Sequence, residues 1–186
     1  MVMMIGRKGN VSLIILLILG LSLMSGCIDS DDSNGGKDFV FTLLDGTTAR
    51  LSDYRGKIVI VDMWATWCGP CKTQLIELNK INEHYGKEDL EIISLDIDDR
   101  ETSQYIIDFI EDFKNDYDIE LDWTIGQDDG SVWEEYLING GIPTLYIFDQ
   151  KGKIHFTHEG VSFFSEVPYG YPDTTPILKS IIDELI

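Results

Sequence analysis

Two cysteines, Cys68 and Cys71, are separated by Gly69 and Pro70 in the stretch WATWCGPC, which follows an apolar run. Such a pair can be a redox couple, half of a metal site, or two inert buried thiols. The apolar run is typical of a buried strand and the following residues of a helix, so the pair is predicted at a helix N-terminus. Helix N-termini stabilise anions and favour the reactive thiolate. Position and spacing together favour a redox pair that closes a small disulfide ring.

The metal-site alternative needs more ligands than the sequence offers. A structural zinc site commonly has two Cys pairs, or one Cys pair and two suitably spaced His residues. Here one Cys pair is accompanied by His84, His155 and His158, which form no such motif. His155 and His158 fall on opposite faces of a predicted strand. The sequence therefore predicts no metal site and no separate cofactor, because the sulfur pair itself carries two electrons.

The elements that position the cysteines alternate between strand and helix patterns, which predicts an α/β fold with a layered sheet. Expected strands cover 39–43, 57–64, 90–97, 121–125, 145–148 and 154–158. Expected helices begin at residue 70 or 71 and at 102 or 103, and two further helices cover 131–137 and 176–186.

Two motifs carry a family resemblance. The stretch VDMWATWCGPCK at 61–72 resembles the active site of the thioredoxin family, and GIPT at 141–144 resembles its cis-proline loop. With DYRGK at 53–57 and a hairpin around Gly152, the chain is most similar to membrane-anchored, extracytoplasmic thioredoxin-like thiol:disulfide oxidoreductases, including those of cytochrome c maturation. The resemblance covers roughly 38–160 and the final helix.

This resemblance implies a three-layer α/β/α sandwich with a mixed central sheet. It places Cys68 exposed at the helix start, Cys71 buried behind it, and Pro143 opposite in a cis peptide bond. The backbone of Ile142 would then pair with an extended target segment, a form of strand addition that tolerates many sequences. The expected substrate-binding residues are Trp67, Gly69, Pro70, Ile142 and Pro143.

Asp62 is the third expected catalytic residue, because thioredoxin has a buried acid at this position. A buried carboxylate without a cationic neighbour has a raised pKa, which suits it to take the proton from Cys71. Many membrane-anchored relatives instead have Asn here and a Glu after the second cysteine, near where this chain has Gln74. The lysine that accompanies the acid in thioredoxin matches Ser94, and Ile76 replaces a helix-kinking proline. These departures lie beside the cysteine pair and therefore bear on its redox potential.

The N-terminus is interpreted as a targeting segment. Arg7 and Lys8 precede an apolar stretch at 11–24, within the roughly 7 to 15 residues typical of a signal-peptide core. The sequence MSGC ending at Cys27 resembles a lipoprotein signal, in which that cysteine is lipidated. An uncleaved anchor is the open alternative, because 9–28 carries no charge. Both interpretations place the rest of the chain outside the cytoplasm.

The expected organisation is a lipoprotein-type signal peptide at 1–26, a polar, flexible tether at 27–37 and a thioredoxin-like domain at 38–186. The composition of the whole chain, 44% hydrophobic and 11% aromatic, is that of a folded protein. The formal net charge of -19 argues against nucleic acid as a partner, because phosphate binding needs a basic face.

These observations predict a monomeric reductase that exchanges its Cys68–Cys71 pair with the cysteines and disulfides of exported proteins. Its lipid would hold it on the outer face of the cytoplasmic membrane, where a membrane electron donor would reduce it. A copper chaperone on the same fold is the alternative, although such proteins usually show wider cysteine spacing and a ligand histidine. A peroxidase of related fold would carry its reactive cysteine in a different context. The sequence sets neither the direction of electron flow nor the role of 162–175.

Overall fold

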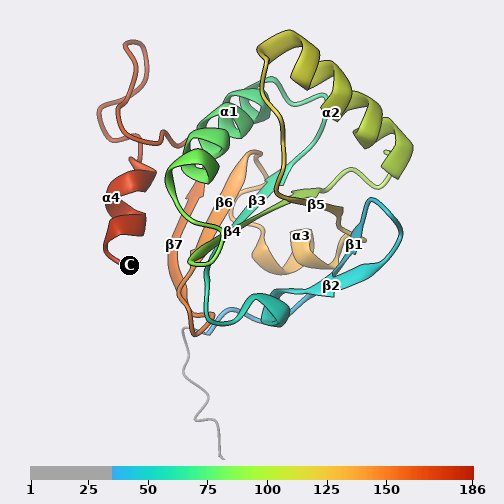
Figure 1. Cartoon of the computed structure of the whole chain (residues 1–186), viewed down its shortest axis with the longest axis horizontal. Coiled ribbons are helices and arrows are strands. Elements are labelled where there is room, and N and C mark those ends of the chain that lie inside the picture. The colour runs from blue at the N-terminus through green and yellow to red at the C-terminus, as the bar shows by residue number, and fades with distance from the viewer. Residues whose placement is uncertain (1–34) are drawn as a thin grey trace, which may run out of the picture. The chain divides into compact units, whose positions relative to one another are not determined.

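The computed structural model describes residues 35–186 and contains a seven-stranded mixed sheet in the order β2-β1-β5-β4-β3-β6-β7 (Figure 1). The strands are β1 (Val40–Leu43), β2 (Thr48–Arg50), β3 (Ile58–Trp64), β4 (Leu90–Asp96), β5 (Thr124–Gln127), β6 (Thr144–Phe148) and β7 (Ile154–Glu159). The helices are η2 (Leu51–Tyr54, 3-10), α1 (Gly69–His84), α2 (Ser103–Tyr117), α3 (Ser131–Tyr136) and α4 (Leu178–Asp183).

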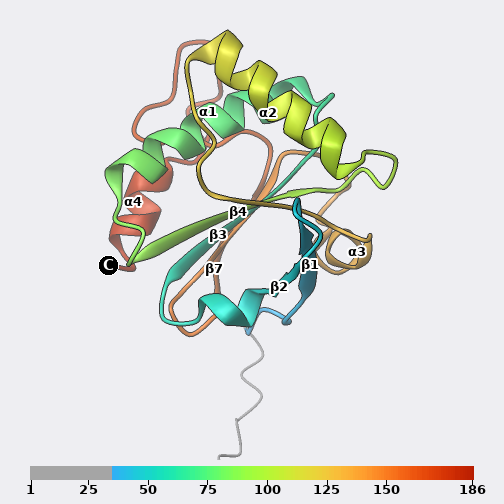
Figure 2. The same ribbon diagram turned by 45° about the vertical axis from the view of Figure 1, so that its right-hand side comes forward.

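The central strand β3 explains the layered architecture. All seven of its residues are buried, and it pairs in parallel with β4 and antiparallel with β6. Because strand side chains alternate between faces, Ile60 and Trp64 point to one layer and Val61 and Met63 to the other. Figures 1 and 2 show α1 and α2 on one side of the sheet and α3 on the other. The predicted α/β/α sandwich with a mixed sheet is therefore confirmed.

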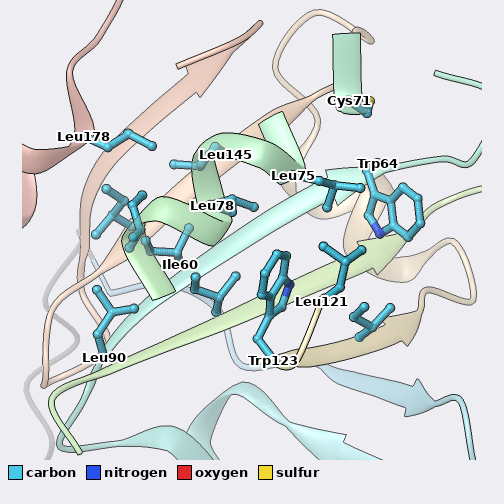
Figure 3. Close-up of a cluster of buried hydrophobic side chains, with 14 of the residues drawn as sticks. Ile60, Trp64, Cys71, Leu75, Leu78, Leu90, Leu121, Trp123, Leu145 and Leu178 are labelled. Carbon is cyan, nitrogen blue, oxygen red and sulfur yellow. The ribbon is translucent and has the colours of Figure 1, made fainter. Parts of the chain in front are cut away.

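Helix α1 carries the cysteines and is fixed by its apolar stripe. Leu75, Leu78 and Ile81 are fully buried against the sheet, and Figure 3 shows Leu75 and Leu78 beside Ile60 and Trp64. Each such buried side chain contributes about 1.5–3 kcal/mol. The stripe therefore holds the start of the helix, and the sulfurs on it, at the end of β3.

The strands and helices differ from the expected ones in three places. Strand β2 and helix η2 were not expected, since the short TAR strand at 48–50 lacks apolar alternation. Strand β5 begins at Thr124 rather than at residue 121, because ladder pairing with β4 starts at Ile93↔Thr124 while the preceding apolar residues pack as irregular core. Helix α4 is shorter than the predicted 176–186.

Several N-terminal predictions lie outside the described residues, namely the signal peptide at 1–26, Cys27 and the tether as far as residue 34. At the start of the described part, the Gly36 N–H donates to the Gly152 carbonyl at 3.1 Å. No helix within residues 35–186 combines the length and the apolar character that crossing a membrane requires.

Candidate active site

The two cysteines form a closed disulfide at the N-terminus of α1, with Cα atoms 5.2 Å apart. Cys68 is the N-cap residue, and its sulfur accepts a hydrogen bond from the Cys71 N–H at 3.2 Å. Pro70 occupies the first turn, where its missing N–H costs nothing. The first-turn N–H groups and the helix dipole therefore converge on the Cys68 sulfur and stabilise a thiolate there.

The disulfide is more covered than expected. Cys71 is fully buried, and Cys68 is only 4% exposed, so the expectation that Cys68 is exposed is wrong for this oxidised form. The cover comes from the loop before β6, because the Ile142 carbonyl oxygen lies 3.7 Å from the Cys68 sulfur. The neighbouring Trp67 is 62% exposed. The exposed residues beside the disulfide are therefore Trp67, Gly69 and Pro70.

The Ile142–Pro143 segment is placed by the sheet. The peptide bond between these residues is cis, and Pro143 is buried. Strand β6 starts at the next residue, where Thr144 pairs with Met63 of β3. Since β3 also leads into the cysteine loop, this register brings two segments that are far apart in sequence to the same end of the sheet.

Asp62 lies fully buried on the α1 side of the sheet, in the same side-chain register as Ile60 and Trp64. One of its oxygens accepts a hydrogen bond from the Ser94 hydroxyl at 3.4 Å, and Trp123 Nε1 donates to that hydroxyl at 3.0 Å. Within residues 35–186 the other oxygen has no partner. Burial raises the pKa of Asp62 to about 7. A carboxyl group with this pKa can accept or donate a proton near neutral pH.

The loop after β4 accepts hydrogen bonds from the two residues that precede Cys68. Trp67 Nε1 donates to Asp98 at 2.7 Å, and Arg100 pairs with the same carboxylate. Hydrogen bonds from Arg100 and Trp67 keep the pKa of Asp98 well below its usual range. The Thr66 hydroxyl donates to Glu101 at 2.5 Å.

An open hollow of about 440 Å³ lies between Trp67 and the loop that follows β4. It is also lined by Thr102 and Tyr105.

Sequence reasoning did not identify this loop as part of the site. A signal was present, because the acidic run DIDDRE at 96–101 begins at the end of the strand predicted at 90–97. The carboxyl ends of adjacent parallel strands lie at one edge of a sheet, and here β4 is parallel to the strand that leads to the cysteines.

Two buried polar side chains of α1 anchor the segment that follows β7. Gln74 Oε1 accepts from the Ser162 N–H at 2.8 Å, and Glu77 accepts from the Phe164 N–H at 2.8 Å. Gln74 is fully buried, and its amide nitrogen has no partner within the described part of the chain. Gln74 therefore accepts a backbone hydrogen bond from the segment that follows β7.

The described histidines and acids form no metal centre. Among residues 35–186, no group of three or more His, Cys, Asp or Glu side chains is arranged to hold a metal ion. His155 lies 3.7 Å from Glu184 at the end of α4, at a point where the register of the β6–β7 ladder shifts.

Comparisons with known proteins agree with this geometry. A family model described as the AhpC/TSA family matches residues 35–157. Thiol-disulfide oxidoreductase ResA of Bacillus cereus is 33% identical over 149 residues, which cover 76% of this chain and 82% of that protein.

Two solved structures are similar as well. A thiol:disulfide interchange protein of DsbE type from Chlorobium tepidum has a TM-score of 0.65 at 23% identity, covering 82% of this chain and 95% of its own, and supports the fold. The exposed lipoprotein thioredoxin Etrx1 of Streptococcus pneumoniae has a TM-score of 0.54 at 28% identity, covering 79% and 99%. These comparisons give the copper-chaperone alternative no support.

Proposed function

The chain belongs to the AhpC/TSA family and is a thioredoxin-like thiol:disulfide oxidoreductase, and on this premise we propose that it reduces disulfides of exported proteins. The observation that carries the proposal is the Cys68–Cys71 disulfide at the N-terminus of α1, with the Cys71 N–H directed at the Cys68 sulfur. The sulfur pair supplies the redox chemistry without a separate cofactor.

The reaction proceeds through two thiol–disulfide exchanges from the dithiol form. The Cys68 thiolate attacks one sulfur of the target disulfide, forms a mixed disulfide and releases the first target thiolate. Asp62 then takes the proton of the Cys71 thiol, and the resulting thiolate attacks the Cys68 sulfur. This step releases the second target thiolate and closes the Cys68–Cys71 bond. Two electrons pass from the protein to the target.

Target binding uses the surface around Cys68. The backbone of Ile142 lies beside the disulfide and can pair with an extended segment of the target. Main-chain pairing makes few demands on side chains, so the range of targets is broad. Trp67, Gly69 and Pro70 are all exposed beside Cys68 and complete the contact surface, and the buried Pro143 acts through the backbone of its neighbour Ile142.

The protein acts outside the cytoplasm as a lipid-anchored monomer. The support lies in the sequence at 1–37, in the MSGC motif ending at Cys27, and in similarity to a structure described as an exposed lipoprotein. Because one acyl chain binds membranes only marginally, stable anchoring at Cys27 calls for at least two chains. A membrane electron donor regenerates the dithiol.

Variants of the two cysteines test the assignment of the sulfurs. Cys71→Ser should accumulate mixed disulfides with target proteins through Cys68, because the second exchange is blocked. Cys68→Ser should trap almost none, although it removes one thiol as well and is therefore the matched control. Non-reducing gels measure the amount of mixed disulfide that each variant forms, and mass spectrometry identifies the cysteine that carries the adduct. Adducts that accumulate only on Cys71 would contradict the mechanism.

A further inference from the structure

Glu159, the last residue of β7, connects this edge strand to the loop that precedes Pro143. It pairs with Thr144 in the β6–β7 ladder, and its carboxylate reaches the loop from there. Oxygen Oε2 accepts hydrogen bonds from the N–H groups of Asn139 at 2.8 Å and Gly141 at 3.1 Å. A single carboxylate oxygen thus fixes two backbone amides of the loop.

The loop is shaped to admit this carboxylate. A Cβ atom at Gly141 would lie 2.8 Å from Glu159 Oε1, which is too close for any side chain without a shift. Gly140 has φ +98°, a conformation that favours glycine. Two adjacent glycines therefore permit the close wrapping of the loop around Glu159.

The same loop is held on both sides of Ile142. The Gly160 N–H donates to the Pro143 carbonyl at 2.8 Å, and the Thr144 hydroxyl donates to the Gly141 carbonyl at 2.7 Å. Within residues 35–186 no hydrogen bond to the Ile142 N–H is formed. The supported loop consequently leaves one N–H without a partner in Ile142, the residue whose carbonyl oxygen lies 3.7 Å from the Cys68 sulfur.

We propose that Glu159 is a positioning residue that fixes the Ile142 backbone for pairing with an extended target segment. The inference rests on the proposed function, since it concerns how targets bind. A loop that is ordered before binding does not lose that conformational freedom when the target binds. Glu159 acts through Asn139 and Gly141 and contacts neither sulfur.

If Glu159 positions the Ile142 backbone, its substitution should weaken the reduction of targets that have a peptide backbone more than the reduction of small disulfides. Insulin offers such a backbone, whereas the small aromatic disulfide DTNB does not. Glu159→Ala removes the acceptor, while Glu159→Gln retains an oxygen that can accept both N–H bonds. Glu166→Ala is the charge control, because Glu166 makes no side-chain hydrogen bond or ion pair in the described chain.

The test compares kcat/KM for insulin and for DTNB in the full chain. Glu159→Ala should lower the insulin-to-DTNB ratio about tenfold, mainly through the KM for insulin, because the loop loses both hydrogen bonds that order it before the target binds. Glu159→Gln and Glu166→Ala should hold the ratio within about threefold of the unsubstituted protein. An unchanged ratio in Glu159→Ala, or an equal loss with Glu159→Gln, would overturn the proposal.

Amide hydrogen exchange separates this inference from the proposed function. The N–H groups of Asn139 and Gly141 should exchange faster in Glu159→Ala than in Glu159→Gln, because only the alanine variant lacks the acceptor. Unchanged exchange would refute the positioning role whatever the activity is. If the unsubstituted protein fails to reduce insulin, the proposed function is wrong, and the exchange data still decide whether Glu159 fixes the loop.

Discussion

Replacing Asp62 with Asn should change how the stability of the oxidised protein depends on pH. The carboxyl group is fully buried in β3, and among residues 35–186 the Ser94 hydroxyl is the one group that donates a hydrogen bond to it. Desolvation penalises its charged form and raises the pKa from 3.8 to about 7. Asparagine has nearly the same size and cannot ionise, so the substitution isolates the cost of the buried charge.

The size of the effect follows from the two pKa values. The folded protein holds the proton more tightly than the unfolded chain, so stability falls as pH rises from about 4 to about 7 and then levels off. The separation between 3.8 and about 7 corresponds to about 4 kcal/mol at roughly 1.4 kcal/mol per pKa unit. About 3 kcal/mol of this falls between pH 4.5 and pH 8.5.

Urea unfolding of both proteins with the disulfide intact measures this contribution. The free energy of unfolding of Asp62→Asn minus that of the unsubstituted protein should increase by about 3 kcal/mol from pH 4.5 to pH 8.5. Taking the difference cancels other groups that titrate, including Asp96, whose pKa burial and the nearby Glu101 carboxyl group raise to about 8. A difference that is constant with pH would refute the account of Asp62 as a buried group titrating near neutrality.

The same variant has a kinetic consequence. If Asp62 takes the proton of Cys71, Asp62→Asn should slow resolution of the mixed disulfide about a hundredfold near neutral pH while leaving the attack by Cys68 unaffected. Rapid-mixing kinetics with a fluorescent disulfide peptide resolve the two steps. An unchanged pH profile for resolution would remove Asp62 from the mechanism.

Two further predictions concern the α1 anchor and the redox potential. Gln74→Ala should lower the free energy of unfolding by about 1–3 kcal/mol, because the buried Ser162 N–H loses its acceptor; urea unfolding measures the change, and a stability equal to that of the unsubstituted protein would contradict the role of this bond. The reduction potential of the Cys68–Cys71 pair, measured against glutathione, should lie below about -180 mV, and a higher value would contradict the reductase direction.

Most helices and strands could be predicted from the sequence, because the apolar pattern of each one lies within a single continuous segment. Strand β3 follows from a continuous apolar run that only Asp62 interrupts, and the stripe on α1 follows from helical apolar periodicity. The boundaries that differed, at β2, β5 and α4, depend on pairing with neighbouring strands or on packing. Backbone pairing decides where a strand begins, and a single segment does not contain its partner.

The sequence by itself determined the redox pair, because the chemistry of Cys68 and Cys71 depends on a spacing of three residues and on the helix that starts between them. It also identified Asp62 as a buried acid. Only the tertiary structure decided what surrounds these groups. Ser94 reaches Asp62 through the parallel register of β3 and β4, and Glu159 reaches Gly141 across a loop and a hairpin. Hydrogen bonds between a side chain and a distant backbone leave no local pattern, because they depend on where the sheet brings the two segments together.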